Sequence, residues 1–590
     1  MIDTNKIVDD YLQKRNWEAQ SNSNQTYCYG SLNNYISGEI SKDYWLNNVY
    51  PRYIREKHTD GAMHIHDLSG LTLYCCGYSL KSILLKGIKG ASNIAVSSPA
   101  KHFDACLNQI ANIITNFQNE ILGAVALNSV DTLISPFVKA DNLEYKQVKQ
   151  HIQNFIYSIN SNSRNGAEPA FTNVTFDLTP PEDLLNEKAI VGGAEADFTY
   201  ADCQTEMDMI NRAFFEIMLG GDADGRPFAY PIPTYNIHKR FDWDNPNNEL
   251  LWEMTGKHGY PYFANYINSD MSPEDSRSMC CRLRLDLKEL RKRNGGLFGS
   301  GDGTGSIGVV TINYPRLAYK HRGDKRGFYR ELDVLLECAR DSLEIKRKWL
   351  QENVIENNLL PLFNEYVGTL DNHFSTIGCV GFNEMCENFY PRRRDIVTEI
   401  GHAFSREVAE HTKNRIAQFQ QSTGHLYNFE ATPAEATCYR FALMDREKYK
   451  YIITQGTKAA PYYTNSCHIP VDRITGIQDI FEHQDDLQTI FTGGTVIHLY
   501  TNTEIPGETA KNIIKSACEN YHSPYISISP LNRYCDDHGY VAIAADFCPK
   551  CGRQLEKYQR ITGYIRRVSN FNDGKKSEFR DRIQLNVTAE

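Results

Sequence analysis

Helix-like and strand-like segments alternate along most of the 590-residue chain, and this alternation constrains the fold more than any other feature. Residues 325–351 and 394–413 carry apolar side chains near a helical period, with charged residues between them. Short apolar runs typical of buried strands fall at residues 171–178, 309–312, 496–500 and 525–528. Strands that are apolar throughout need helices on their faces, so the pattern predicts an α/β sheet or barrel.

Composition narrows the class of protein. The formal net charge of -10 argues against a general nucleic-acid-binding role, which needs a basic footprint. We find no run of about eighteen apolar residues and no apolar signal segment at the N-terminus, so a cytoplasmic enzyme without a membrane span is expected. In a reducing compartment the 16 cysteines are expected to be metal ligands, catalytic thiols or buried apolar residues rather than disulfides.

Two ligand pairs lie near the C-terminus. Cys535 and His538 form the first pair, Cys548 and Cys551 the second, and each pair encloses two residues. This spacing is typical of a zinc ribbon, and four ligands leave no open position, so a structural zinc ion is predicted. The alternative is a surface histidine beside free thiols. Zinc ribbons often bind nucleic acid, which is the alternative role for this module.

The segment after the second pair is basic and contains a glycine motif. From Arg553 to Arg582 there are nine basic and four acidic residues, an excess of five. Within this tail lies Arg560-Ile561-Thr562-Gly563-Tyr564. A radical at a glycine Cα flattens the centre, where a Cβ would crowd it, so glycine suits a stored radical. A glycine in a turn is the alternative, since that is the commonest use of glycine.

This motif, placed just after a zinc ribbon, resembles the C-terminal signature of glycyl radical enzymes. The chain as a whole resembles the anaerobic (class III) ribonucleotide reductases over nearly its full length. The segments that carry the resemblance are His64–Leu68, Tyr74–Leu80, Phe171–Asn173, Asn265–Met271, Met279–Leu283, Val309–Arg316, Asn428–Glu435 and Tyr462–Ser466. Two departures are Ile561, where the family usually has valine, and His538, where it usually has a fourth cysteine.

The resemblance implies a fold and a division of the chain. The expected fold is a ten-stranded α/β barrel with a central finger loop, followed by a small zinc ribbon and a glycyl radical tail. Residues 1–525 would form the barrel with a helical dimerisation and effector region, residues 526–556 the zinc module, and residues 557–590 the glycyl radical domain. Many relatives carry an N-terminal ATP-cone module. We expect none here, either because the lineage lacks it or because the chain was trimmed.

The resemblance also implies catalytic roles. Gly563 would store the radical, and Cys281 would receive it as a thiyl and abstract hydrogen from the ribose 3′ carbon, with Cys280 as the alternative. Cys75, rather than the adjacent Cys76, would deliver a proton and hydrogen to the opposite face, where the 2′-hydroxyl leaves as water. Asn313 would hydrogen-bond the ribose hydroxyls, because an amide offers both a donor and an acceptor.

The expected activity is reduction of ribonucleoside triphosphates to deoxyribonucleoside triphosphates, with deoxynucleotides and ATP as effectors and a homodimer as the assembly. An asparagine at position 313 is associated in the resemblance with formate as the reductant. The chain has no Cys-x-x-x-Cys-x-x-Cys motif, so a separate activase with a [4Fe-4S] cluster and S-adenosylmethionine is expected to install the radical. The alternatives are another glycyl radical enzyme, such as a pyruvate formate-lyase or a dehydratase, and a zinc-ribbon interaction protein.

Overall fold

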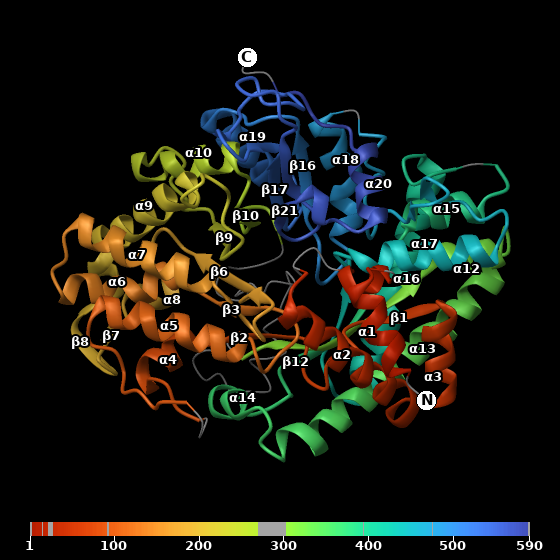
Figure 1. The fold of residues 1–590 in the computed structure, drawn as a ribbon, viewed down its shortest axis with the longest axis horizontal. Coiled ribbons are helices and arrows are strands. Elements are labelled where there is room, and N and C mark those ends of the chain that lie inside the picture. Colours follow the sequence, from red (N-terminus) through yellow and green to blue (C-terminus); the bar gives the residue numbers. More distant parts are fainter. Residues whose placement is uncertain are drawn as a thin grey trace.

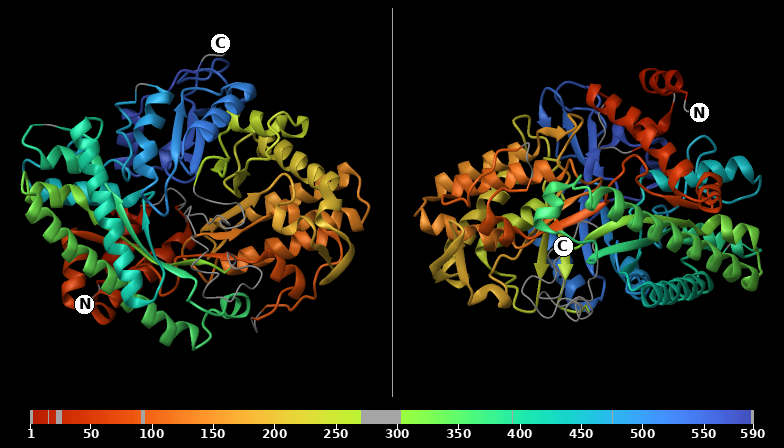
Figure 2. Two further views of the ribbon diagram at one scale, coloured as in Figure 1. Left: turned by 180° about the vertical axis from the view of Figure 1, so that it is seen from behind. Right: turned by 90° about the horizontal axis from the view of Figure 1, so that it is seen from below.

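The computed structural model describes residues 3–14, 16–21, 27–90, 94–269, 303–392, 394–474 and 476–587 (Figure 1). Helices surround a large central sheet, and a smaller C-terminal sheet lies at one end of the molecule (Figure 2). Within these ranges, no helix combines the length and the apolar composition that crossing a bilayer requires.

Ten strands form one hydrogen-bonded path through the central sheet. In order they are β13 (Tyr427–Glu430), β12 (His373–Val380), β11 (Gly305–Asn313), β2 (Cys75–Tyr78), β3 (Val125–Leu127), β6 (Thr172–Phe176), β9 (Ile232–Ile237), β10 (Tyr262–Asn265), β17 (Tyr525–Pro530) and β16 (Ile497–Thr501). An eleventh strand, β1 (Met63–Ile65), pairs with β11 beside this path. The strand-like runs predicted from sequence coincide with β6, β11, β16 and β17.

The strands form two sets of opposite direction. Strands β2, β3, β6, β9 and β10 are parallel to one another, and the sheet turns antiparallel where β2 meets β11 and where β10 meets β17. At the ends of the path, Glu430 of β13 forms a parallel bridge with Gly493, just before β16. The α/β architecture is thus confirmed. Among the described residues the two end strands meet through this bridge, not through a continuous ladder.

Helices cover the outer side of the strands. Helix α13 (Lys325–Leu350) packs on β11 and β12, and it matches the helix predicted at 325–351. Helix α16 (Glu399–Thr423) packs on β13. It begins later than the periodicity predicted, because the Thr398 side chain accepts a hydrogen bond from the amide of Gly401 and caps the helix there. These contacts bury the apolar faces of both helices against the sheet.

A four-stranded antiparallel sheet follows the barrel strands. Its order is β19 (Gly539–Tyr540), β18 (Asn532–Cys535), β20 (Glu556–Arg560) and β21 (Ile565–Arg567). The chain then forms helix α20 (Asp573–Asp581). Strand β20 therefore connects the segment with the Cys and His pairs to the segment with Gly563. The division into three domains stays a prediction.

Candidate active site and metal site

A cavity of about 470 Å³ lies among the ends of the central strands. Its lining includes Cys75 at the start of β2 and Gly563 in the turn between β20 and β21. Residues from the N-terminal helices, from β6 and from the loop after β13 complete the wall. The fold thus brings together two residues that lie far apart in the sequence and that sequence reasoning had singled out.

Cys75 and Cys76 have different surroundings. Cys75 lines the cavity, is 2% exposed, and its sulfur accepts a hydrogen bond from the amide of Ala124 at 3.4 Å. Cys76 is fully buried in the hydrophobic core, because successive side chains of a strand point to opposite faces. The structure therefore places Cys75, and not Cys76, at the cavity.

The turn that contains Gly563 is held through its backbone. The carbonyl oxygen of Gly563 accepts hydrogen bonds from the Tyr262 hydroxyl at 2.7 Å and from Arg560 Nη1 at 3.0 Å. The guanidinium of Arg560 lies 4.2 Å from the centre of the Tyr262 ring and also donates to the carbonyls of Gly259 at 2.5 Å and Tyr260 at 3.1 Å. Five-donor guanidinium geometry allows one buried side chain to fix several carbonyls.

Tyr564, the residue after Gly563, is anchored on the opposite side of the turn. Its hydroxyl donates to the Glu435 carboxylate at 2.9 Å, and the Arg566 guanidinium lies 4.5 Å from its ring centre. Burial and the neighbouring Glu435 raise the pKa of Tyr564 well above its ordinary value, so the hydroxyl stays protonated and remains a donor. The amide of Ile561 closes the turn by donating to the carbonyl of Tyr564 at 3.0 Å.

Asn313 lies elsewhere. It ends β11, where its side-chain nitrogen donates to the Gly61 carbonyl and to Asp445, both at 2.9 Å, and its oxygen accepts from the amide of Arg316 at 3.1 Å. It lines a separate cavity of about 240 Å³. Its donors and its acceptor thus bind the protein itself, and the structure does not bring Asn313 together with Cys75 and Gly563.

Ser306 occupies the position on β11 that faces Cys75. The two residues are paired across the antiparallel junction of β2 and β11, and the Ser306 hydroxyl lies 3.0 Å from that of Thr376. Sequence reasoning did not single out Ser306, since no motif placed it opposite a cysteine. Cys281 and its alternative Cys280 lie outside the described residues.

Two half-buried histidines of the cavity wall were recognised only as part of a matching segment, and a neighbouring arginine, Arg440, was not recognised at all. His64 and His66 line the cavity, their rings 4.6 Å apart, and Arg440 Nη1 lies 3.3 Å from His64 Nδ1. Burial, with Lys346 and Arg440 nearby, lowers the pKa of His66 to about 3, and burial with His66 and Arg440 lowers that of His64 well below its ordinary value. Both imidazoles are therefore neutral at neutral pH, while the half-buried Arg440 keeps a positive charge in the same wall.

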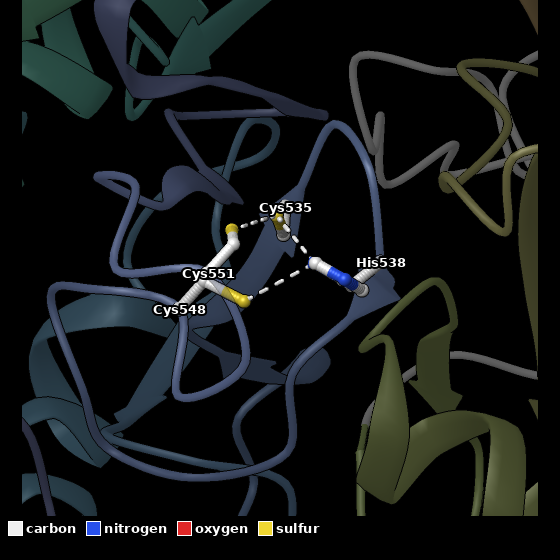
Figure 3. Close-up of side chains that lie close together, drawn as sticks. All are labelled: Cys535, His538, Cys548 and Cys551. Atoms are coloured by element: carbon white, nitrogen blue, oxygen red, sulfur yellow. Dashed lines mark hydrogen bonds between the residues drawn. The ribbon is translucent and has the colours of Figure 1, made fainter.

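The four predicted metal ligands converge on one point (Figure 3). The ligand atoms of Cys535, His538, Cys548 and Cys551 all lie within 4.8 Å of one another. The sulfur of Cys535 lies 3.5 Å from His538 Nδ1 and 3.6 Å from the sulfur of Cys551. Tetrahedral zinc with bonds of about 2.3 Å would separate its sulfur ligands by about 3.8 Å, so the donor set and its spacing fit a closed metal site.

Known proteins match almost the whole chain. A sequence model of the family described as "Anaerobic ribonucleoside-triphosphate reductase" matches residues 21–584. The protein of that name from Escherichia coli (strain K12) is 22% identical over 589 residues, covering 93% of this chain and 80% of that protein. The one from Enterobacteria phage T4 is 24% identical over 656 residues, covering 98% of this chain and 99% of that protein.

Solved structures agree in fold. The anaerobic ribonucleotide reductase from Thermotoga maritima with dATP bound in the specificity site superposes with a TM-score of 0.74 at 20% identity, covering 96% of each chain. A hydroxyproline dehydratase from Clostridioides difficile superposes less closely, with a TM-score of 0.52 at 11% identity, covering 96% of this chain and 88% of that one. The family match extends over the barrel, the metal ligands and the segment of Gly563, and the chain belongs to the anaerobic ribonucleoside-triphosphate reductases.

Proposed function

We propose that ribonucleoside triphosphates are reduced in the cavity lined by Cys75 and Gly563, with a radical stored on Gly563. The observation that carries this proposal is that one cavity contains both residues. Thiyl-mediated chemistry on a ribose needs a thiol and a stored radical close to the substrate. The wall of this cavity contains the thiol of Cys75 and the hydrogen-bonded turn with Gly563.

The proposed reaction begins with hydrogen transfer from the Cys281 thiol to Gly563, which leaves a thiyl radical on Cys281. The thiyl takes the 3′ hydrogen atom of the ribose, and the Cys75 thiol donates a proton to the 2′-hydroxyl, which leaves as water. The reductant, formate in this proposal, is oxidised to carbon dioxide and supplies two electrons and a proton, so that the 2′ carbon gains a hydrogen, while a proton from solvent restores the Cys75 thiol. Cys281 then returns its hydrogen atom to the 3′ carbon, and the thiyl so formed recovers a hydrogen atom from Gly563, which restores the glycyl radical. Hydrogen transfer between bound groups requires that they be held within contact distance, so the proposal needs Cys281 and the ribose to meet Gly563 and Cys75 in this cavity.

The triphosphate would lie at the start of helix α17 (Ala436–Lys448). Ala436 and Thr437, at its N-terminus, line the cavity, as does the half-buried cation Arg440 on the next turn. Free amides at a helix N-terminus and a nearby cation favour phosphate groups. The Thermotoga maritima structure described as a complex with dATP and CTP holds both nucleotides, which supports ribonucleoside triphosphates as substrates and deoxynucleotides or ATP as effectors here.

Four further elements of the proposal rest on the resemblance. They are formate as reductant, a radical S-adenosylmethionine activase with a [4Fe-4S] cluster, a homodimer, and zinc as the metal bound by Cys535, His538, Cys548 and Cys551. Bound zinc would cross-link the two ligand pairs and hold the ribbon folded. The position of Asn313 does not support formate as the reductant, because Asn313 does not line the cavity. Release of labelled carbon dioxide from labelled formate during turnover tests the reductant, and activity sustained by a thioredoxin-like protein instead would reverse this element.

The decisive experiment measures deoxynucleotide formation from CTP or ATP by protein that has been activated anaerobically. Cys75→Ser should retain the glycyl radical signal and lose product formation, because the proton donor is gone while the radical store is intact. Cys76→Ala is the matched control, since Cys76 lies in the core rather than at the cavity, and it should keep most of the activity. Deoxynucleotide formation by Cys75→Ser at the wild-type rate would contradict the role of Cys75.

Other glycyl radical enzymes remain the alternative function. Pyruvate formate-lyases and dehydratases would share a glycyl radical at Gly563 but would not turn over nucleotides. An activated protein that carries the radical and leaves every ribonucleoside triphosphate unchanged would favour that alternative.

A further inference from the structure

Helix α20 and its C-cap residue Arg582 carry a buried cluster of charges beside the turn that contains Gly563. Lys575, Glu578 and Arg582 have side chains that are 1%, 5% and 0% exposed. Glu578 accepts from Lys575 at 2.5 Å and from Arg582 at 2.9 Å. Burial alone would raise the pKa of Glu578, but the two cations outweigh it and hold that pKa below its ordinary value. The cluster has two cations and one anion, so one buried positive charge needs further partners.

The backbone before Gly563 supplies these partners. Arg582 donates from Nη1 to the carbonyl of Arg560 at 3.0 Å and to Gln559 Oε1 at 3.0 Å, and from Nη2 to the carbonyl of Ile561 at 3.2 Å. Its guanidinium also lies 4.2 Å from the ring centre of Tyr500 on β16. Carbonyl dipoles thus solvate a cation that has no access to water.

Two arginines therefore hold the turn through different carbonyls. Arg560, together with Tyr262, fixes the carbonyl of Gly563, and Arg582 fixes the carbonyls of Arg560 and Ile561. Arg560 belongs to the recognised motif, whereas Arg582 lies outside it, at the C-cap of helix α20. The position of Gly563 in the cavity consequently depends on where α20 is docked.

Helix α20 is docked onto the barrel independently of the turn. The side chain of Asn572, its N-cap, donates to the carbonyl of Glu435 at 3.2 Å, and the Tyr462 hydroxyl lies 3.0 Å from the Asp581 carboxylate. After the helix, the amide of Ile583 donates to the carbonyl of Val471 at 2.8 Å. The helix packs on α17 and on β15 (Pro461–Tyr462). The contact of Asn572 with Glu435 connects α20 to the same loop, after β13, that lines the cavity.

We infer that Arg582 is a positioning residue, which fixes Gly563 in the cavity by coupling the turn to helix α20. The inference rests on the proposed function, because a position for Gly563 matters only if Gly563 carries the radical. If the turn left the cavity alone, Arg582 would be buried with too few partners, which is costly. The turn and α20 therefore leave the barrel as one unit when the activase acts on Gly563.

Arg582→Lys tests this coupling. Lysine keeps the positive charge but lacks the planar fork that reaches both carbonyls and Glu578 together. Hydrogen exchange in the zinc-loaded protein before activation should become faster by on the order of tenfold in peptides covering residues 557–566 and 573–582. Exchange in the barrel strands should not change. Arg580→Lys is the matched control, since exposed Arg580 bonds only within its own helix to Ser577, at 3.4 Å, among the contacts that the described chain shows.

Measurements on the activated protein then distinguish a positioning role of Arg582 from a role in stability alone. The Arg582→Lys protein should form at least the wild-type number of glycyl radicals per chain, because the turn is easier to extract. Turnover per radical should fall by roughly ten- to a hundredfold, because a displacement of about 1 Å misaligns hydrogen transfer. A role limited to folding would instead lower the number of radicals and leave turnover per radical unchanged.

Three outcomes would overturn the inference: unchanged exchange in both peptides, faster exchange spread over the barrel, and unchanged turnover per radical. Failure of the proposed function looks different. In that case the wild-type protein itself would show no glycyl radical signal or no deoxynucleotide product, whatever the exchange of the variants.

Discussion

The metal site and the Gly563 turn are neighbours in the chain, joined by strand β20, yet they are held in opposite ways. In the metal site four side chains point inward to one point, and two of them, His538 and Cys551, are exposed. Its own apolar core is small, consisting of Cys535, Cys548 and Leu555 with a few partly buried neighbours. In the Gly563 turn side chains from outside point inward to backbone carbonyls, and those of Arg560 and Arg582 are almost fully buried.

The difference indicates which interactions hold each region in its folded conformation. We expect the ribbon to be organised by a bound metal and to fold locally, because metal binding and folding are coupled in such small modules. The turn is organised by side chains from outside it, Tyr262 from β10 of the central sheet and Arg582 at the C-cap of α20. Removing the metal should therefore affect the turn only through β20. Replacing a side chain that donates a hydrogen bond to the turn should affect the turn directly and leave the metal content unchanged.

The largest effect is expected from Gly563→Ala. A Cβ on the reacting carbon crowds the planar radical centre, so the variant should show no glycyl radical signal and no turnover. Activated wild-type protein exposed to air should be cut at Gly563 into a long fragment and a short C-terminal peptide, and the variant should stay whole. Electron paramagnetic resonance and gel electrophoresis measure both effects.

The metal content is the control for Gly563→Ala. Zinc binding and hydrogen exchange in the barrel should match the wild type, since the ligands are unchanged. A cut elsewhere in the chain, or an intact chain after exposure of activated wild-type protein to air, would contradict the assignment of Gly563.

Removal of the metal should have the next largest effect. Cys548→Ser replaces a buried ligand, so the variant should lose zinc and loosen β18 and β20, and with β20 the turn. We expect little or no glycyl radical, and treatment of the wild-type protein with a chelator should act similarly. Full radical yield in a zinc-free protein would show that the two regions are independent and that β20 does not couple them.

The sequence patterns predicted the features that depend on the spacing of residues close together in the chain. The four ligands fall within seventeen consecutive residues, so their spacing alone predicted the cluster that the structure contains. The helix at 325–351 followed from its apolar period, which packing on β11 and β12 explains. The start of α16 was predicted too early, because the cap at Thr398 determines it and the apolar period does not.

These sequence patterns did not predict contacts between residues that lie far apart in the chain. The motif around Asn313 identified strand β11 but not which end of the strand meets the cavity. Ser306 faces Cys75, and seven positions along an extended strand span on the order of 20 Å, so Asn313 lies near a different cavity. Tyr262 binds the carbonyl of a glycine 301 residues away, a contact that depends on the pairing of β10 with β17 in the central sheet.

Arg560→Lys should have a smaller effect than loss of the metal. The lysine keeps the charge but cannot hold the carbonyls of Gly259, Tyr260 and Gly563 together. Hydrogen bonds to charged groups contribute about 1.5–3 kcal/mol, which corresponds to roughly ten- to a hundredfold in radical lifetime or turnover. Zinc content should not change. Arg567→Lys on β21, where the arginine contacts Tyr558 rather than the turn, is the matched control, and an equal loss there would contradict a specific role for Arg560.

Tyr262→Phe should have the smallest effect and give the sharpest test. The ring that Arg560 covers remains, and only the 2.7 Å hydrogen bond to the Gly563 carbonyl is lost. One neutral hydrogen bond contributes about 1 kcal/mol, so radical lifetime and turnover per radical should fall roughly fivefold. Tyr558→Phe removes a hydroxyl that accepts from Arg567 in the small sheet, and it should leave both quantities unchanged. If both variants lost the same amount, the turn would depend on the small sheet as a whole, and the contrast between a metal-organised ribbon and a barrel-organised turn would fail.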